Sequence, residues 1–167
     1  MILVTGATGF VGRRLVRRLC AGKVPLRLLV HRRPPGQAFA GLNVEFARGD
    51  VADPAALETA CAGCDAVVHL VAIIRERGRA TFQAINHQGA RNVAAAARKA
   101  GVRRFVHMSA IGAQDSLRFP YLRSKWQGEQ AVIQSGIPYA ILRGSIVFGP
   151  GDEFMTRLAD LVRRLPV

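Results

Sequence analysis

Short apolar runs alternate along the chain with longer segments in which apolar residues recur every three or four positions. The first pattern is typical of buried strands and the second of amphipathic helices. Strands are predicted at residues 2–4, 25–30, 44–47, 66–71, 105–108 and 139–142, and helices at residues 10–21, 54–60, 81–100, 121–134 and 153–165. This alternation predicts an α/β fold, a doubly wound and mostly parallel sheet with helices on both faces.

The turn between the first strand and the first helix carries glycines at positions 6, 9 and 12. Gly6 can turn the strand end, Gly9 can let a pyrophosphate approach the main chain, and Gly12 can let helix and strand pack closely. The unpaired N–H groups and the positive dipole end of the helix then form an anion site. Because the glycines lie directly between a strand and a helix, they predict a nucleotide phosphate site rather than a tight turn without a ligand.

The ends of the next strands offer further contacts to a dinucleotide. Arg32 and Arg33 follow the second strand, where an acid would bind the ribose of NAD and an arginine would receive the 2′-phosphate of NADP. They favour NADP, and the alternative is that they are solvated loop charges. Asp50 has two interpretations, an acceptor for the adenine amino group or the cap of the helix from Pro54. Ala72 ends the fourth strand with a small side chain beside which the ribose can lie.

Tyr121 and Lys125 are four residues apart and therefore project from one face of a predicted helix. An unperturbed tyrosine has a pKa of about 10. A lysine one turn away, together with a positive nicotinamide ring, would favour the phenolate and allow proton exchange with a substrate hydroxyl or carbonyl. The pair follows a phosphate turn and a strand that delivers Ser109 and Ala110 to the sheet edge, which favours a catalytic role.

Together these motifs resemble the short-chain dehydrogenase/reductase superfamily, in its extended or atypical branch with the NAD-dependent epimerase/dehydratase domain. The resemblance covers essentially the whole chain. Residues 105–110 and 145–154 look most like the subgroup related to the 39 kDa accessory subunit of respiratory complex I. The matching positions are residues 5–12, 49–51, 69–72, Asn86, 121–125 and 142–150.

The resemblance implies that residues 1–167 form an NAD(P)-binding Rossmann domain, with the start of a truncated substrate-side region from about residue 151. The C-terminal substrate domain is then largely absent. The implied cofactor is NAD(P), and Arg32 and Arg33 make NADP the expected form, preferred over NAD. The implied cofactor contacts are Gly6, Thr8, Gly9, Phe10, Val11, Gly12, Arg32, Arg33, Asp50, Val51, Val71, Ala72 and Lys125.

The same resemblance implies that Tyr121 is the general acid/base and that Lys125 is its partner and a ligand of the nicotinamide ribose. Two positions depart from the family pattern. Ala110 stands where the family places its catalytic serine or threonine, which leaves Ser109 as the remaining candidate if the backbone shifts. Gly144 stands where an Arg-Pro pair is usual.

Charge and composition limit the partners, disulfides and metal sites that the chain can have. The formal net charge of +13 would suggest nucleic acid or anionic lipid if the arginines were clustered, but they are spread along the chain, so nucleic acid is not expected. Cys20, Cys61 and Cys64 are too few for a disulfide framework, and the spacing of the last two is read as a helix end rather than a redox motif. His69 and His107 are expected to be satisfied structural residues, and no metal site is expected.

No apolar run reaches the about 20 residues of a membrane span. We expect a cytoplasmic protein and leave open a peripheral association with the inner membrane. The first of two functions is an NADP-preferring oxidoreductase or epimerase/dehydratase that uses Tyr121 and Lys125 on a carbonyl or hydroxyl of an unknown small molecule. The second is a non-catalytic dinucleotide-binding accessory or assembly subunit related to respiratory complex I, or a regulator, which Ala110 favours.

A homodimer is a further expectation from the resemblance. It would form through the helices at residues 81–100 and 121–134. The alternative is that the alanine-rich faces of these helices pack on the chain's own sheet.

Overall fold

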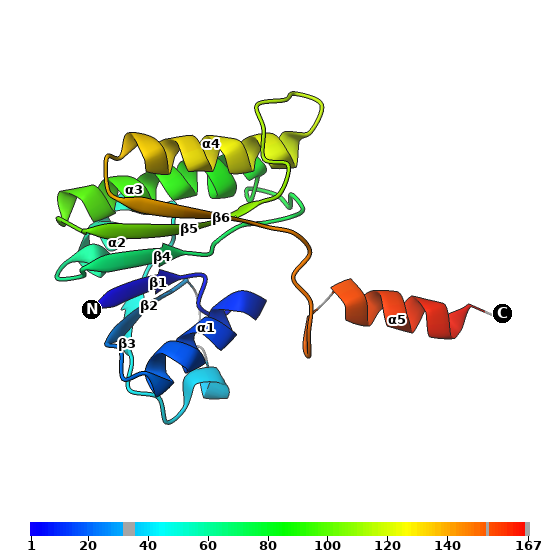
Figure 1. Cartoon of the computed structure of the whole chain (residues 1–167), viewed down its shortest axis with the longest axis horizontal. Helices are drawn as coiled ribbons and strands as arrows, with labels where there is room; N and C mark the ends of the chain where they lie inside the picture. Colours follow the sequence, from blue (N-terminus) through cyan, green and yellow to red (C-terminus); the bar gives the residue numbers. More distant parts are fainter. Residues whose placement is uncertain (32–35, 153, 166–167) are drawn as a thin grey trace.

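Six parallel strands form a single sheet in the computed structural model, which describes residues 1–31, 36–152 and 154–165. Their order is β3-β2-β1-β4-β5-β6 (Figure 1). The direction of strand succession reverses between β1 and β4, where sheets of this kind bind ligands at the carboxyl edge. The strands are β1 (Ile2–Thr5), β2 (Leu26–Val30), β3 (Glu45–Arg48), β4 (Ala66–His69), β5 (Arg104–Ala110) and β6 (Tyr139–Gly144).

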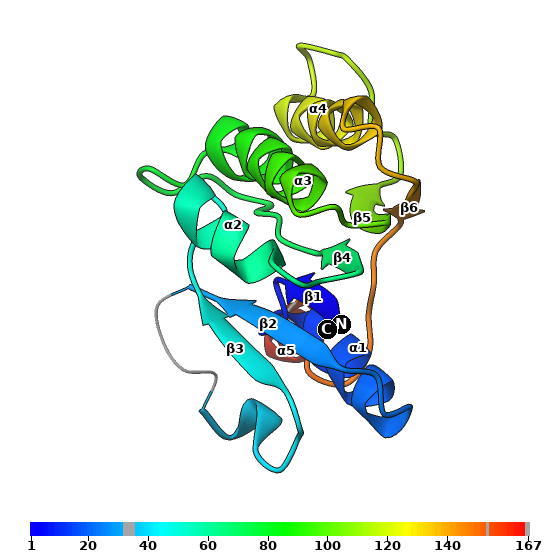
Figure 2. The same ribbon diagram turned by 90° about the vertical axis from the view of Figure 1, so that its left-hand side faces the viewer.

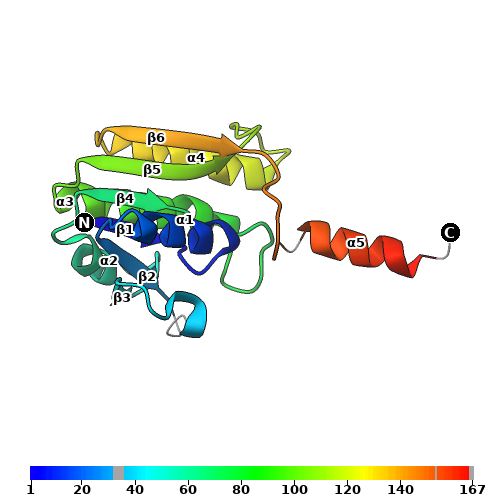
Figure 3. The same cartoon turned by 60° about the horizontal axis from the view of Figure 1, so that its bottom comes forward.

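Helices cover both faces of the sheet, as Figure 2 shows. On one face lies α1 (Phe10–Ala21), followed later in the chain by the short 3₁₀ turn η1 (Gly36–Phe39). On the other face lie α2 (Pro54–Cys61), α3 (Ala90–Lys99) and α4 (Pro120–Gln134). The last helix, α5 (Phe154–Arg164), extends beyond the carboxyl edge of the sheet (Figures 1 and 3).

The buried strands contribute alternate residues to two apolar cores, one on each face of the sheet, because successive side chains of a strand point to opposite faces. Leu3 and Phe105 face α2, α3 and α4, whereas Val4 and Leu28 pack with Val16 on the side of α1. The alanine row of α3 is buried against the sheet, since Ala90, Ala94 and Ala97 are 0 to 1% exposed. The alanine-rich face of this helix therefore packs on the chain's own sheet, which was the alternative to a dimer contact through that face. This leaves the opposite side of α3 to solvent.

The predicted elements are all present, with two informative differences. The predicted helix at residues 81–100 is divided, because a π-helical segment, η2 (Gln83–Gly89), precedes α3. The last strand is longer than predicted, because β6 continues to pair with β5 through Ser109 and Ala110. Neither α5 nor any other described helix is long and apolar enough to cross a membrane.

Candidate dinucleotide and active site

The glycine turn is built as the sequence predicts. Gly6 has a φ of +74°, which favours glycine, and a Cβ there would lie 2.9 Å from the carbonyl carbon of Leu70. A Cβ on Gly12 would lie 2.3 Å from the Gly6 carbonyl oxygen, so only glycine lets α1 approach the turn this closely. The Gly9 amide donates to that same carbonyl oxygen at 3.0 Å. The three glycines therefore turn and pack the backbone at one point.

The first turn of α1 is open to an anion. Gly9 caps α1 with its backbone only, and no acidic residue occupies the first turn. By contrast, Asp53 caps α2 and accepts hydrogen bonds from the amides of Ala55 and Ala56. The N–H groups and positive dipole end of α1 thus have no carboxylate against them, which fits a bound pyrophosphate.

A cavity of about 390 Å³ adjoins this turn at the carboxyl ends of β1, β2 and β4. Asp50 lines it, pairs with His31 at 2.6 Å and accepts a hydrogen bond from the Ala52 amide. The capping interpretation of Asp50 was therefore wrong, because Asp53 caps α2 instead. Of the predicted cofactor contacts, the cavity is lined by Gly6, Thr8, Gly9, Asp50, Val51, Val71 and Ala72.

The other predicted contacts that the structure describes do not line this cavity. Arg32 and Arg33 fall outside the described residues. Gly12 packs under the turn, and Val11 lines neither of the two cavities beside it. Phe10 lines a second cavity of about 430 Å³, which shares Thr8 and Gly9 with the first.

This second cavity brings together three arginines of α1 that the sequence shows only as spread charge. Arg13 donates to the Thr8 carbonyl oxygen at 2.7 Å, and Arg14 donates to the carbonyl oxygens of Phe10 and Pro150. Arg17 is the third. The positive charge at the glycine turn is therefore larger than the helix dipole alone supplies.

Tyr121 and Lys125 lie on the first turns of α4, close to the carboxyl end of β5. The Lys125 side chain is 2% exposed, and its Nζ donates to the Met108 carbonyl oxygen at 2.7 Å. Burial lowers the pKa of Lys125 to about 8, partly opposed by Glu129. Tyr121 stacks edge-on against Phe82, and burial raises the pKa of its phenol. This shift is opposite to the expected one toward the phenolate, so in the protein alone the Tyr121 phenol is protonated at neutral pH.

Glu129 is a buried carboxylate at the same site that sequence reasoning missed. It is 1% exposed and holds Arg143 of β6 through two hydrogen bonds of 2.9 and 2.7 Å. Burial by itself raises the pKa of Glu129, but the hydrogen bonds from Arg143 and the nearby Ser109 hydroxyl outweigh it, so the net pKa is lowered. The signal was present in the sequence, because Glu129 continues the inward row of Tyr121 and Lys125 at a spacing of four.

Ser109 lies in β5 rather than beyond its end. Its hydroxyl is buried and has no partner at standard hydrogen-bond geometry within the described chain, although it faces Glu129 closely enough to affect its pKa. Ser109 is thus beside the Glu129 carboxylate on the sheet face that α4 covers.

Two histidines extend this buried polar row across the sheet. The rings of His69 and His107 stack at 5.4 Å and 11°, and Thr5 shares a hydrogen bond of 2.7 Å with His69 Nδ1. Burial lowers the pKa of His107 to about 3 and that of His69 well below its ordinary value, so both rings are neutral. Both histidines are buried, as expected for structural residues. The expectation that their hydrogen-bonding groups are satisfied was wrong, because neither ring nitrogen of His107 has a hydrogen-bond partner among the described residues.

Asn86 connects the loop after β4 to α4. Its amide accepts from the Ile73 N–H at 2.8 Å and donates to the Ile73 carbonyl oxygen and to Ser124 Oγ, at 3.0 and 3.1 Å. Ser124 in turn donates to the Tyr121 carbonyl oxygen. Asn86 therefore ties the first cavity to the helix that carries Tyr121 and Lys125.

The cysteine pair takes no part in this site. Cys61 ends α2 and Cys64 follows it, both buried and free. Burial raises the pKa of the Cys61 thiol to about 12. Because the thiolate is the reactive form, the pair is structural, in line with its interpretation as a helix end.

Comparison with known proteins agrees with this geometry. Residues 6–151 match the model of the NAD(P)H-binding family. The chain is 37% identical over 167 residues to the ceramide reductase of Caulobacter vibrioides, covering all of this chain and 52% of that protein. The chain spans about half the length of the curated relatives it matches.

Solved structures show the same arrangement. A short-chain dehydrogenase/reductase superfamily protein from Agrobacterium tumefaciens with bound NAD has a TM-score of 0.72 and 32% identity, covering 86% of this chain and 48% of that one. The NADPH complex of the quinone oxidoreductase QOR2 from Escherichia coli has a TM-score of 0.70 and 28% identity, with coverage of 86% and 48%. With its open glycine turn and parallel sheet, the chain belongs to the NAD(P)H-binding family, within the short-chain dehydrogenase/reductase superfamily.

Proposed function

We propose that the chain is the nucleotide-binding part of an NADP-preferring reductase that acts on a carbonyl substrate. The observation that carries this proposal is the uncapped first turn of α1 beside a cavity, with Tyr121 and Lys125 at the same edge of the sheet. Gly6, Gly9 and the α1 amides would hold the pyrophosphate, and the cavity that Asp50 lines would hold the adenosine.

The preference for NADP rests on charge. The sequence places Arg32 and Arg33 after β2, where NAD enzymes carry an acid, and the cavity beside Thr8 adds Arg13 and Arg17. A 2′-phosphate carries more negative charge than a hydroxyl and gains more from this surface. The test is a parallel titration with NADPH and NADH, followed by nicotinamide fluorescence and thermal shift. Tighter NADPH binding supports the assignment, and equal or tighter NADH binding overturns it.

The catalytic step we propose is proton donation by Tyr121. When bound, the nicotinamide supplies the hydride. The Tyr121 phenol is protonated at neutral pH and would donate this proton to a substrate carbonyl oxygen, but burial raises its pKa and so opposes the release. Lys125 would support the phenolate that remains, after exchanging the Met108 carbonyl oxygen for the cofactor ribose. Ser109 would serve only after a local backbone shift, because its hydroxyl now faces Glu129.

Two named relatives support a proposal for the substrate class. One is a ceramide reductase, and another, 32% identical over 188 residues, is the 2-alkyl-3-oxoalkanoate reductase of Stenotrophomonas maltophilia. A reducible carbonyl on a molecule with a long alkyl chain is the substrate we propose. A panel of 2-alkyl-3-oxoalkanoates of increasing chain length, assayed by NADPH oxidation, tests this; turnover that does not rise with chain length contradicts it.

The substitution Tyr121→Phe separates a catalytic role from a purely binding one. It removes the phenolic proton and keeps the ring that packs on Phe82. A reductase loses turnover, by about a hundredfold or more for a missing general acid, and keeps its affinity for NADPH. Unchanged turnover in this variant excludes Tyr121 as the acid.

A second candidate function is a non-catalytic accessory or assembly subunit that binds the dinucleotide as a structural ligand. Ala110 favours it, because the usual catalytic hydroxyl is absent there. In this case NADPH raises the melting temperature by mass action, no carbonyl is reduced, and Tyr121→Phe has no effect. Peripheral association with a respiratory complex would accompany this second function. Under either function we propose a cytoplasmic location for the protein.

A further inference from the structure

The inner face of α4 carries two buried groups of opposite charge, one turn apart. Lys125 is 2% exposed and Glu129 is 1% exposed, and they are four residues apart in the helix. Side chains at this spacing are neighbours on one helix face, with Cβ atoms about 5 to 6 Å apart. A buried ammonium group and a buried carboxylate therefore lie next to each other at the candidate active site.

The strands under α4 anchor both of these side chains. Lys125 Nζ donates to the Met108 carbonyl oxygen of β5 at 2.7 Å. Glu129 accepts hydrogen bonds of 2.9 and 2.7 Å from Arg143 of β6. In the register of the two strands Arg143 lies beside Ser109, which directly follows Met108 in the chain. The two anchors therefore occupy adjacent positions of the sheet, which fixes where α4 lies on it.

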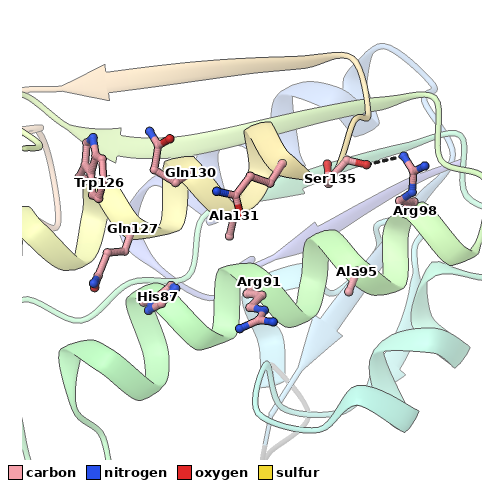
Figure 4. A pocket seen from close by; sticks show the side chains of 10 residues that line it. His87, Arg91, Ala95, Arg98, Trp126, Gln127, Gln130, Ala131 and Ser135 are labelled. Atoms are coloured by element: carbon pink, nitrogen blue, oxygen red, sulfur yellow. Dashed lines mark hydrogen bonds between the residues drawn. The ribbon is translucent and has the colours of Figure 1, made fainter. Parts of the chain in front are cut away.

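No other acid of the helical layer can take the place of Glu129. It is the only acidic residue in η2, α3 and α4. The side of α4 that faces η2 and α3 across a cavity carries Trp126 and a row of glutamines (Figure 4). None of the described residues that line that cavity is acidic. On the helix side, Lys125 therefore has one carboxylate beside it.

The strands facing Lys125 contribute neutral rings. None of the described residues of β4, β5 or β6 is acidic. Burial is the main reason that the pKa of His107 is lowered to about 3 and that of His69 well below its ordinary value, and the charge of Lys125 lowers both further. Tyr121, one turn before Lys125, is protonated at neutral pH. These neutral groups cannot balance an ammonium charge.

The charge of Lys125 therefore depends on Glu129. Burial favours the neutral form of an amine, so a buried ammonium group without a counter-charge loses its proton more readily. Burial lowers the pKa of Lys125 to about 8, and Glu129 opposes this shift. Without the carboxylate, Lys125 would lose its proton at a lower pH still.

We propose that Glu129 is a positioning residue that acts through Lys125: it balances the ammonium charge and, held by Arg143, keeps α4 in place over β5. The catalytic part of this inference rests on the proposed reductase, in which Lys125 supports the phenolate of Tyr121 and contacts the cofactor ribose. A neutral Lys125 would stabilise the phenolate far less. Glu129 then sets the upper pH limit of turnover without touching the substrate itself.

The protonation of Lys125 can be followed directly, because the chain has only three lysines, Lys23, Lys99 and Lys125. Lysine labelled with ¹³C at Cε gives three signals in a ¹H–¹³C correlation spectrum, and Lys23→Arg and Lys99→Arg each remove one of the others. Titrated without cofactor or substrate, the Lys125 signal should have a midpoint near pH 8 in the parent. In Glu129→Gln we expect the midpoint to fall by about one pH unit, the effect of one charge across a helix turn.

Two further variants separate charge from packing. Glu129→Asp keeps the carboxylate and should restore most of the shift in the Lys125 midpoint. Glu58→Gln removes the same charge from an exposed pair with Lys99 and should leave that midpoint unchanged. In the NADPH oxidation assay, the loss of kcat/KM in Glu129→Gln should be about fivefold larger at pH 8 than at pH 6, because a midpoint one unit lower leaves Lys125 mostly neutral at pH 8.

The outcomes distinguish this inference from the proposed function. An unmoved Lys125 midpoint in Glu129→Gln overturns the inference, because Glu129 then only holds the fold. An equal shift in Glu129→Asp overturns it too, since the cause would be packing and not charge. A moved midpoint with an unchanged pH profile of kcat/KM overturns the positioning role. Absence of turnover in the parent overturns the proposed reductase and the catalytic part with it, and the midpoint alone then decides the charge balance.

Discussion

Replacing Glu129 with glutamine tests whether the ion pair between the buried Glu129 and the half-exposed Arg143 holds α4 against β6 at the candidate active site. Glu129 is 1% exposed and forms two hydrogen bonds to Arg143. Glutamine keeps the volume and can still accept one hydrogen bond, so the substitution removes one charged hydrogen bond and the charge itself. No cavity is created, which confines the effect to electrostatics.

The expected loss follows from these contacts. A hydrogen bond to a charged group contributes about 1.5 to 3 kcal/mol, and the solvent at Arg143, which is 51% exposed, screens part of this. We expect Glu129→Gln to destabilise the fold by about 2 kcal/mol. For a chain of this size that lowers the melting temperature by about 4 to 8 °C.

The assay is thermal unfolding followed by circular dichroism, at several pH values, with Glu58→Gln as control. Glu58 forms an exposed pair with Lys99 and should cost about 0.5 kcal/mol or less. The folded-state pKa of Glu129 is lowered, so its contribution is complete above the unfolded pKa of about 4.3 and is lost as the pH falls through the folded pKa. The difference between the parent and Glu129→Gln should therefore shrink in acid.

A loss for Glu129→Gln no larger than that for Glu58→Gln would refute this reasoning. So would a loss that persists unchanged in acid, because the effect would then come from packing and not from charge.

Three further predictions follow from the same structure. Gly12→Ala should lower the free energy of unfolding by at least about 2 kcal/mol and weaken NADPH binding, because the new Cβ would lie 2.3 Å from the Gly6 carbonyl oxygen. Gly22→Ala is the control and should be tolerated, because the nearest atom to its Cβ is 3.4 Å away. Urea unfolding and fluorescence titration compare the two variants. His107, with a folded pKa of about 3, binds a proton more readily when unfolded, so stability falls as the pH falls from about 6.5 to 3 by up to about 1.4 kcal/mol per pH unit, and His107→Phe should flatten that slope in urea unfolding by this amount. Asn86→Ala should speed amide hydrogen exchange in the loop after β4 and raise the Kd for NADPH, and unchanged exchange would contradict its role as a connector.

Much of the fold was predictable, because it depends on local pattern. The apolar run before Gly6 can be buried only as a strand covered on both faces, and the glycine spacing allows only a tight turn into α1. The division of the predicted helix at residues 81–100 was not predictable, because the π-helical segment depends on the contacts of Asn86 with a distant loop and with α4.

The candidate site was predictable only in part. The spacing of Tyr121 and Lys125 predicts a shared helix face, but not that Lys125 is buried against the Met108 carbonyl oxygen. Asp50 and Asp53 are equivalent candidates for a cap in the sequence, and only the path of the chain assigns the cap to Asp53. Glu129 was missed because a charged residue on a helix is usually exposed.

By itself, the sequence determined the order of strands and helices, the glycine turn and the spacing of the catalytic candidates, because these depend on neighbours within a few residues. The tertiary structure decided which distant charges meet. It placed the arginines of α1 at the glycine turn and paired Glu129 with Arg143 across two elements. The physical reason is that electrostatic partners depend on distance and burial in space, and a linear pattern specifies neither.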